Sequence, residues 1–132
     1  MKKYILLTSV FLLSGCALVD AYLMAKYDPN EYRLISEIRT DAIIYKKDCD
    51  NREIAKSNAI NLANKTLLFQ NYSEEVPRNK EVIQASKDLN EIAQGLAQRY
   101  SLNVSTAFCK LKLDSIEKNA KVMQQTIGGR PR

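Results

Sequence analysis

Residues 28–53 read DPNEYRLISEIRTDAIIYKKDCDNRE and contain one complete helix and the start of the next. The first letters supply an N-cap at Asp28, a proline in the first turn and a capping-box acid at Glu31. Asp50 and Glu53 repeat that spacing, so we expect a second helix to begin where the first one ends. Between these caps, spacings of three and four residues predict one apolar stripe that packs into a core: Ile35, Ile38, Ala42, Tyr45 and Cys49.

Three further segments show the same helical spacing. We expect the second helix from residue 50 to a loop at 70–78, the third over about 79–102, and the fourth from a cap at 103–105 to the glycines at 128–129. No segment from residue 16 onward shows the sustained alternation that is typical of a strand. The sequence therefore predicts an all-α fold, a small four-helix bundle. The inward side chains expected on these three helices are Ala55, Ala59, Leu62, Thr66, Phe69, Val82, Ala85, Leu89, Ile92, Leu96, Tyr100, Cys109, Leu113, Ile116, Ala120, Met123 and Ile127.

The N-terminus has the layout of a secretory signal peptide. Two lysines and a short apolar run over residues 5–13 precede the letters LSGC, which end at Cys16. This arrangement resembles a bacterial lipobox, which implies that residues 1–15 are removed and that Cys16 is acylated. Several acyl chains supply the multiple anchors that stable tethering needs. Because Ala17 rather than aspartate follows, the resemblance implies sorting to the outer membrane, facing the periplasm. The alternative is an ordinary secreted protein that carries a cysteine at this position.

We therefore divide the chain into four parts. They are a lipoprotein signal peptide at 1–15, a lipidated tether at 16–28, the helical bundle at 29–128 and a basic tail at 129–132. The tail is expected to be solvated.

The composition argues against the commonest catalytic chemistries. The 132 residues include no histidine, which removes the usual general base, the usual zinc ligand and the usual partner of a nucleophile. We expect no catalytic residue, no metal and no cofactor. After signal-peptide removal, 18 basic residues face 15 acidic ones without a basic run, so we expect no nucleic-acid partner. Gly95 lies alone inside a predicted helix, where a close helix contact is the expected reason.

Two cysteines remain once Cys16 is assigned to lipid. Cys49 lies at the end of the first predicted helix and Cys109 near the start of the fourth, each on an apolar face. In an oxidising compartment this pair predicts a disulfide. Closing a loop of 60 residues would stabilise the fold by about 4 kcal/mol in the chain-entropy model. The alternative is a pair of buried free thiols.

The helices carry more apolar side chains than one stripe each requires. The surplus residues are Ile43, Ile44, Leu67, Leu68, Phe108 and Leu111. Either an irregular bundle buries them, or some of them line a groove for an amphipathic helix of a partner.

The chain resembles the type II secretion pilotins in four features. They are the lipobox, the helical bundle, the sequence YKKDC at 45–49 and a second cysteine at the start of the last helix. The segments at 59–63 and 86–96 are similar to the second and third helices of that family. The resemblance covers residues 34–113. It implies an outer-membrane lipoprotein that binds the C-terminal segment of a secretin subunit and pilots it to the outer membrane. We expect a monomer, because small tethered bundles are often monomers. The groove residues we expect on this hypothesis are Ile38, Ile43, Leu62, Leu67, Leu96 and Phe108.

A rival hypothesis assigns the chain to a different class. A phage- or plasmid-encoded exclusion or lysis-control lipoprotein would use the same lipobox, size and disulfide to block a receptor or transfer apparatus. An envelope lipoprotein of structural role is a third possibility. Neighbouring secretion genes would favour the pilotin, whereas capsid, holin or transfer genes would favour exclusion.

Overall fold

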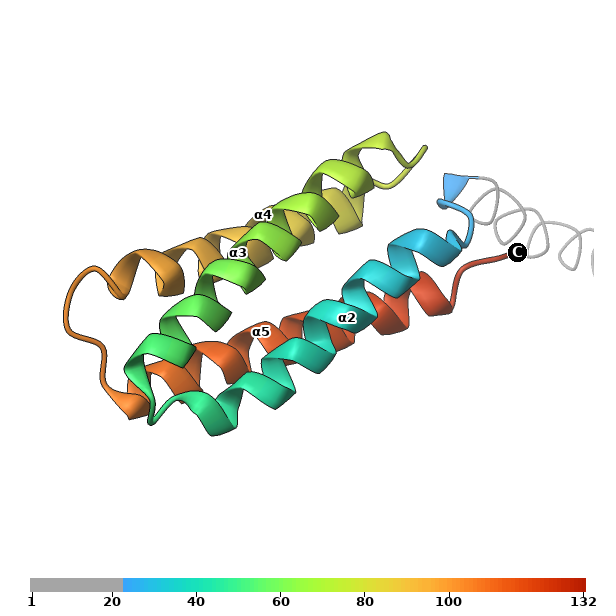
Figure 1. The fold of residues 1–132 in the computed structure, drawn as a ribbon. Helices are drawn as coiled ribbons and strands as arrows, with labels where there is room; N and C mark the ends of the chain where they lie inside the picture. The colour runs from blue at the N-terminus through green and yellow to red at the C-terminus, as the bar shows by residue number, and fades with distance from the viewer. Residues whose placement is uncertain (1–22) are drawn as a thin grey trace, which may run out of the picture.

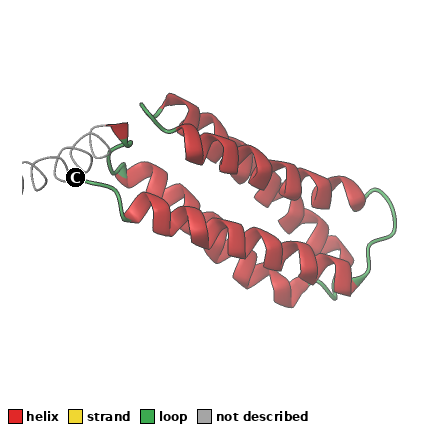
Figure 2. Cartoon of the chain, turned by 180° about the vertical axis from the view of Figure 1, so that it is seen from behind, coloured by secondary structure: helices red, strands yellow, loops and turns green. Residues whose placement is uncertain are grey.

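Four long helices run up and down along one bundle in the computed structural model, which describes residues 23–132 (Figure 1). The expected signal peptide and Cys16 lie outside the described residues. The elements are α2 (Pro29–Tyr45), η1 (Lys46–Asp48), α3 (Arg52–Glu75), α4 (Lys80–Arg99) and α5 (Thr106–Gly128). No strand occurs between residues 23 and 132, and short loops at the two ends join the helices (Figure 2). The predicted all-α four-helix bundle is confirmed.

The apolar stripes meet along the axis of the bundle and form a continuous core. Of the side chains expected to point inward, all are buried except three, which are partly buried: Tyr45, Ala85 and Ile92. Tyr45 reaches the surface because its hydroxyl accepts a hydrogen bond from the exposed Asn61 side chain, at 2.7 Å. Helical periodicity therefore located the core correctly.

The expected loop at 70–78 is wrong over most of its length, because α3 continues to Glu75. Burial of one side chain and one long-range hydrogen bond favour the helix over the turn preference of the local polar residues. Ser73 is fully buried, and the Tyr72 hydroxyl donates to the Asp28 carboxylate at 3.0 Å. The chain leaves the helix only at Val76, whose extended backbone is the conformation expected before Pro77.

Two expected helix caps are shifted or reassigned. The N-cap of α3 is Asn51 rather than Asp50, since its side chain accepts the Ile54 N–H at 3.2 Å. Asp28 does cap α2, but Glu31 does not return a bond to it. The expected cap before the last helix is confirmed, with Ser105 accepting the Phe108 N–H at 3.1 Å.

Glu31 instead forms a buried ion pair with the end of the chain. Its carboxylate is inaccessible to solvent and accepts a hydrogen bond from the Arg130 guanidinium at 2.7 Å. Arg130 also donates to Asn79, which itself donates to the Ser73 carbonyl at 2.9 Å. The expectation of a solvated tail at 129–132 is therefore wrong for Arg130, because a buried carboxylate needs a charged partner. One network thus ties the tail to α2, α3 and α4.

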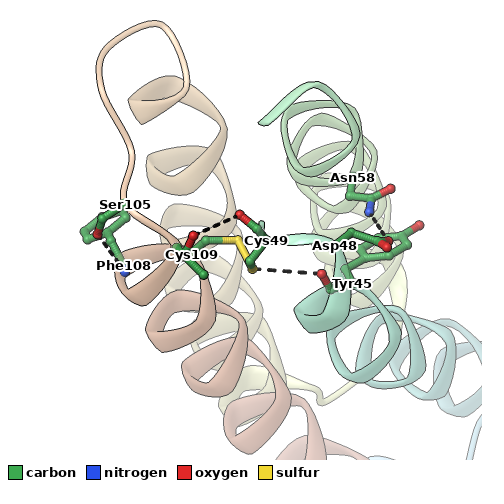
Figure 3. The surroundings of a disulfide bond; sticks show 8 residues. Tyr45, Asp48, Cys49, Asn58, Ser105, Phe108 and Cys109 are labelled. Carbon is green, nitrogen blue, oxygen red and sulfur yellow. Dashed lines mark hydrogen bonds between the residues drawn. A yellow bond between two sulfur atoms is a disulfide. The ribbon is translucent and has the colours of Figure 1, made fainter. Parts of the chain in front are cut away.

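The disulfide between Cys49 and Cys109 is confirmed at the opposite end of the bundle (Figure 3). Their Cα atoms lie 5.8 Å apart, a common disulfide separation. Nearby, the Arg52 guanidinium donates to the carbonyls of Tyr100 and Leu102, both at 2.8 Å. Because those carbonyls are engaged there, the third helix ends at Arg99 rather than at residue 102.

Replacing both cysteines with serine is expected to lower the free energy of unfolding by about 4 kcal/mol, because the cross-link closes a 60-residue loop. Urea unfolding followed by circular dichroism would measure the change. The wild-type domain with added reductant is the control and should match the double variant. Equal stability of the oxidised and reduced domains would contradict a stabilising role for this cross-link.

Arg130→Met is expected to destabilise the bundle by about 3–5 kcal/mol, because it leaves the Glu31 carboxylate buried without its cation. Thermal and urea unfolding would measure the loss. Adding Glu31→Gln to the same variant should recover part of it, since the uncompensated charge is then removed.

Arg132→Met is the matched control for that change. Arg132 is exposed and lies 5.1 Å from the Tyr27 ring centroid, a contact worth at most about 1 kcal/mol. Equal losses in the Arg130 and Arg132 variants would show that the buried ion pair has no special role.

Candidate partner-binding surface

The six residues expected to line a groove do not share one surface. Ile38, Leu62 and Leu96 are at most 1% exposed and belong to the core, so their assignment to a groove is wrong in this structure. They lie on the central stripe of their helices, which is the side that packs inward. Ile43 and Leu67 are exposed, and Phe108 is partly buried.

The three accessible residues lie at different seams between helices. Ile43 is on the side of α2 that faces α5, because Lys46, one turn later, forms ion pairs with α5. Leu67 is on the side of α3 that faces α4, because Gln70, one turn later, accepts a hydrogen bond from α4 at 3.1 Å. Phe108 borders a hollow between α4 and α5. The surplus of apolar residues is thus dispersed, not gathered into the expected groove.

The seam between α4 and α5 carries two adjoining hollows, open to solvent, of about 420 and 340 Å³. Both are lined by Gly95 and Lys112, so they form one depression, which we call the α4–α5 trough. The trough is lined by Asp88, Glu91, Ile92, Gly95, Gln98, Arg99, Leu102, Phe108 and Lys112.

Gly95 leaves the centre of the trough open. A Cβ atom built on it would meet no atom within 4 Å, so the expected close helix contact is wrong. Its backbone is ordinary helix with a negative φ, which any residue adopts. A glycine inside a helix costs about 1 kcal/mol relative to alanine. Neither packing nor backbone geometry requires a glycine at this position.

Phe108 forms the apolar wall at one end of the trough, against two cations. The Arg99 guanidinium carbon lies 5.2 Å and the Lys112 amino nitrogen 5.5 Å from the centroid of its ring. The capping bond from Ser105 and the neighbouring disulfide at Cys109 fix the turn that carries this ring (Figure 3). The covalent cross-link thereby positions one wall of the trough.

The charges along the trough are unevenly distributed. Arg99 lines only the hollow at the Phe108 end and Lys112 lines both hollows, and neither forms an ion pair with another residue of the 23–132 segment. Asp88 and Glu91 lie toward the start of α4. From residue 88 to residue 99 the helix rises about 16 Å, which is the length of three helical turns.

The shifted ionisable groups lie outside the trough. Hydrogen bonds to Asp114 and Glu117 raise the pKa of Lys46, and the same contact lowers the pKa of Asp114. A hydrogen bond to Asp41 raises the pKa of Lys65. These groups join α2 to its two neighbours. They belong to the scaffold rather than to the candidate binding surface.

Between residues 23 and 132, no group of histidine, cysteine, aspartate or glutamate side chains is placed to hold a metal ion. In the same segment no helix is both long and apolar enough to cross a membrane. Comparison with known proteins found no matching family model, no matching curated protein and no matching solved structure.

The sequence indicated only part of the trough. Phe108 was among the expected groove residues, and Gly95 stood out as a lone helical glycine. Arg99, Leu102 and Lys112 were missed, because they lie off the predicted apolar stripes or at the end of a predicted helix. Only the contact between those helices shows that these side chains face one another.

Gly95→Ala is expected to stabilise the bundle by about 0.5–1 kcal/mol, since alanine lowers the entropic cost of the helix and meets no neighbour. Urea unfolding of the wild type and the variant would measure the difference. A loss of stability would contradict the open floor of the trough.

Proposed function

We propose that this chain is a pilotin-like outer-membrane lipoprotein that binds the C-terminal segment of a secretin subunit in the α4–α5 trough. The observation that carries the proposal is the trough itself, with apolar walls at Ile92, Leu102 and Phe108 and charged residues around them. Its length suits an amphipathic helix of three turns, and grooves of this kind recognise such helices through a few apolar anchors.

The N-terminal sequence supplies the second half of the proposed activity. A lipobox ending at Cys16, followed by Ala17, supports acylation and transport to the outer membrane with the bundle in the periplasm. The first helix of the bundle begins at Pro29, 13 residues after that cysteine. The bundle would therefore be held close to the membrane, and a bound segment would travel with it.

Binding is expected to couple to folding of the ligand. A secretin segment that is disordered when free would become helical in the trough, which adds specificity but consumes part of the interaction free energy. The trough is shallow and open, so a few anchors, rather than deep burial, would supply most of the affinity.

The test measures fluorescence anisotropy of a labelled synthetic peptide, the last 20 or so residues of the host's secretin, with the mature domain (residues 17–132). Leu102→Asp in the trough is expected to weaken binding more than about tenfold, because it places a charge against the apolar anchor. Absence of wild-type binding would contradict the pilotin proposal.

Leu111→Asp is the matched control. Leu111 and Leu102 are 64% and 62% exposed, but Leu111 lies on α5 outside the trough. Its variant should bind like the wild type. Equal weakening by the two changes would remove the trough from the proposal. If the tethered protein instead captures a receptor or transfer component from its host's envelope, and no secretin, the exclusion hypothesis replaces this one.

A further inference from the structure

We infer that the α4–α5 trough accepts its helix in one direction, with the terminal carboxylate of the ligand at Arg99 and Lys112. This inference rests on the proposed function, because it concerns the secretin segment. It adds the chemical group that the ligand must carry, a terminal carboxylate, and the direction in which the ligand lies in the trough.

The hollow at the Phe108 end is built for an anion attached to an apolar group. Its lining contains two cations, one glutamine and apolar residues, but no acid. Both cations lie against the same aromatic ring, and neither has an acidic partner in the described part of the chain. A carboxylate placed beside that ring would be attracted to both, and hydrogen bonds between ionised groups are the stronger ones.

The hollow at the other end contains more acidic than basic side chains. Asp88 and Glu91 line it beside Ile92, and its only cation is Lys112, which the two hollows share. A positive group of the ligand, such as a lysine or the N-terminal turn of its helix, is favoured there. The charge order of the trough is therefore acidic to basic from the start of α4 toward its end.

A helical ligand has a matching polarity of its own. Its aligned peptide dipoles place a partial positive charge at its N-terminus and a partial negative charge at its C-terminus. A free terminal carboxylate adds a full negative charge at the same end. The reverse orientation would bring that carboxylate against Asp88 and Glu91, so one direction is favoured by both ends at once.

The described ends of the chain lie away from the Phe108 end of the trough. The C-terminal tail is tied at the opposite end of the bundle, where the Tyr27 N–H donates to the Pro131 carbonyl and Arg130 is buried. Helix α2 begins at that same end (Figure 1). Phe108 lies about 30 Å from it, measured along α5 to Gly128.

The experiment compares two synthetic secretin peptides, one with a free C-terminal carboxylate and one with a C-terminal amide. The wild-type mature domain is expected to bind the free acid about tenfold more tightly than the amide. In the Arg99→Gln/Lys112→Gln variant the two peptides should bind equally. Lys110→Gln, which changes an exposed cation of α5 outside the trough, is the control and should keep the preference.

Orientation is read from a nitroxide attached to the N-terminus of the peptide. Broadening of the backbone amide signals near Asp88, but not near Arg99, is expected in the NMR spectrum of the complex. The reverse pattern, or equal binding of acid and amide by the wild type, would overturn the inference while leaving the proposed function intact. Failure of both peptides to bind would overturn the proposed function and this inference with it.

Discussion

The structure depends on a clamp that holds α2 and α5 together at both of their ends. At one end, Cys49, just after α2, is bonded covalently to Cys109 in the first turns of α5. At the other end, Glu31 in the first turn of α2 pairs with Arg130, just after α5. The first contact is a covalent bond and the second is a buried ion pair. Two different interactions therefore resist separation of the two helices, one at each end.

The other two helices, α3 and α4, are held by contacts to this clamp as well as by contacts between their own ends. Asn79, at the start of α4, joins the Glu31–Arg130 network, while Arg52 at the start of α3 holds the carbonyls that end α4. Because both ends of the bundle are fixed in this way, the middle of the α4–α5 seam need not be tightly packed. The trough around Gly95 is therefore compatible with a stable fold, and the clamp also sets the position of Phe108.

Much of the fold could be predicted from the sequence, because helical periodicity and capping are local properties. The stripe from Ile35 to Cys49 follows from spacing, and the disulfide partner at Cys109 follows from spacing together with the compartment that the N-terminal sequence leads us to expect. The failures at Arg130 and in the expected groove share one cause, which is contact between distant segments. Arg130 resembled a solvated tail residue because its partner lies 99 positions away, and Leu62 resembled a groove residue because the sequence does not show which faces meet.

The polarity of the trough has a consequence for the proposed carrier. The tether enters at the end of the bundle where α4 begins, and Arg99 lies at the far end. A secretin segment with its last residue at Arg99 would run back along α4 toward Asp88, so the rest of the secretin would leave the trough on the side nearer the tether. Under the proposed function, that side is the one that an acylated Cys16 would hold at the membrane. The reverse orientation would direct the secretin away from the bilayer, so under this proposal the electrostatics of the trough and the delivery of the secretin favour the same direction.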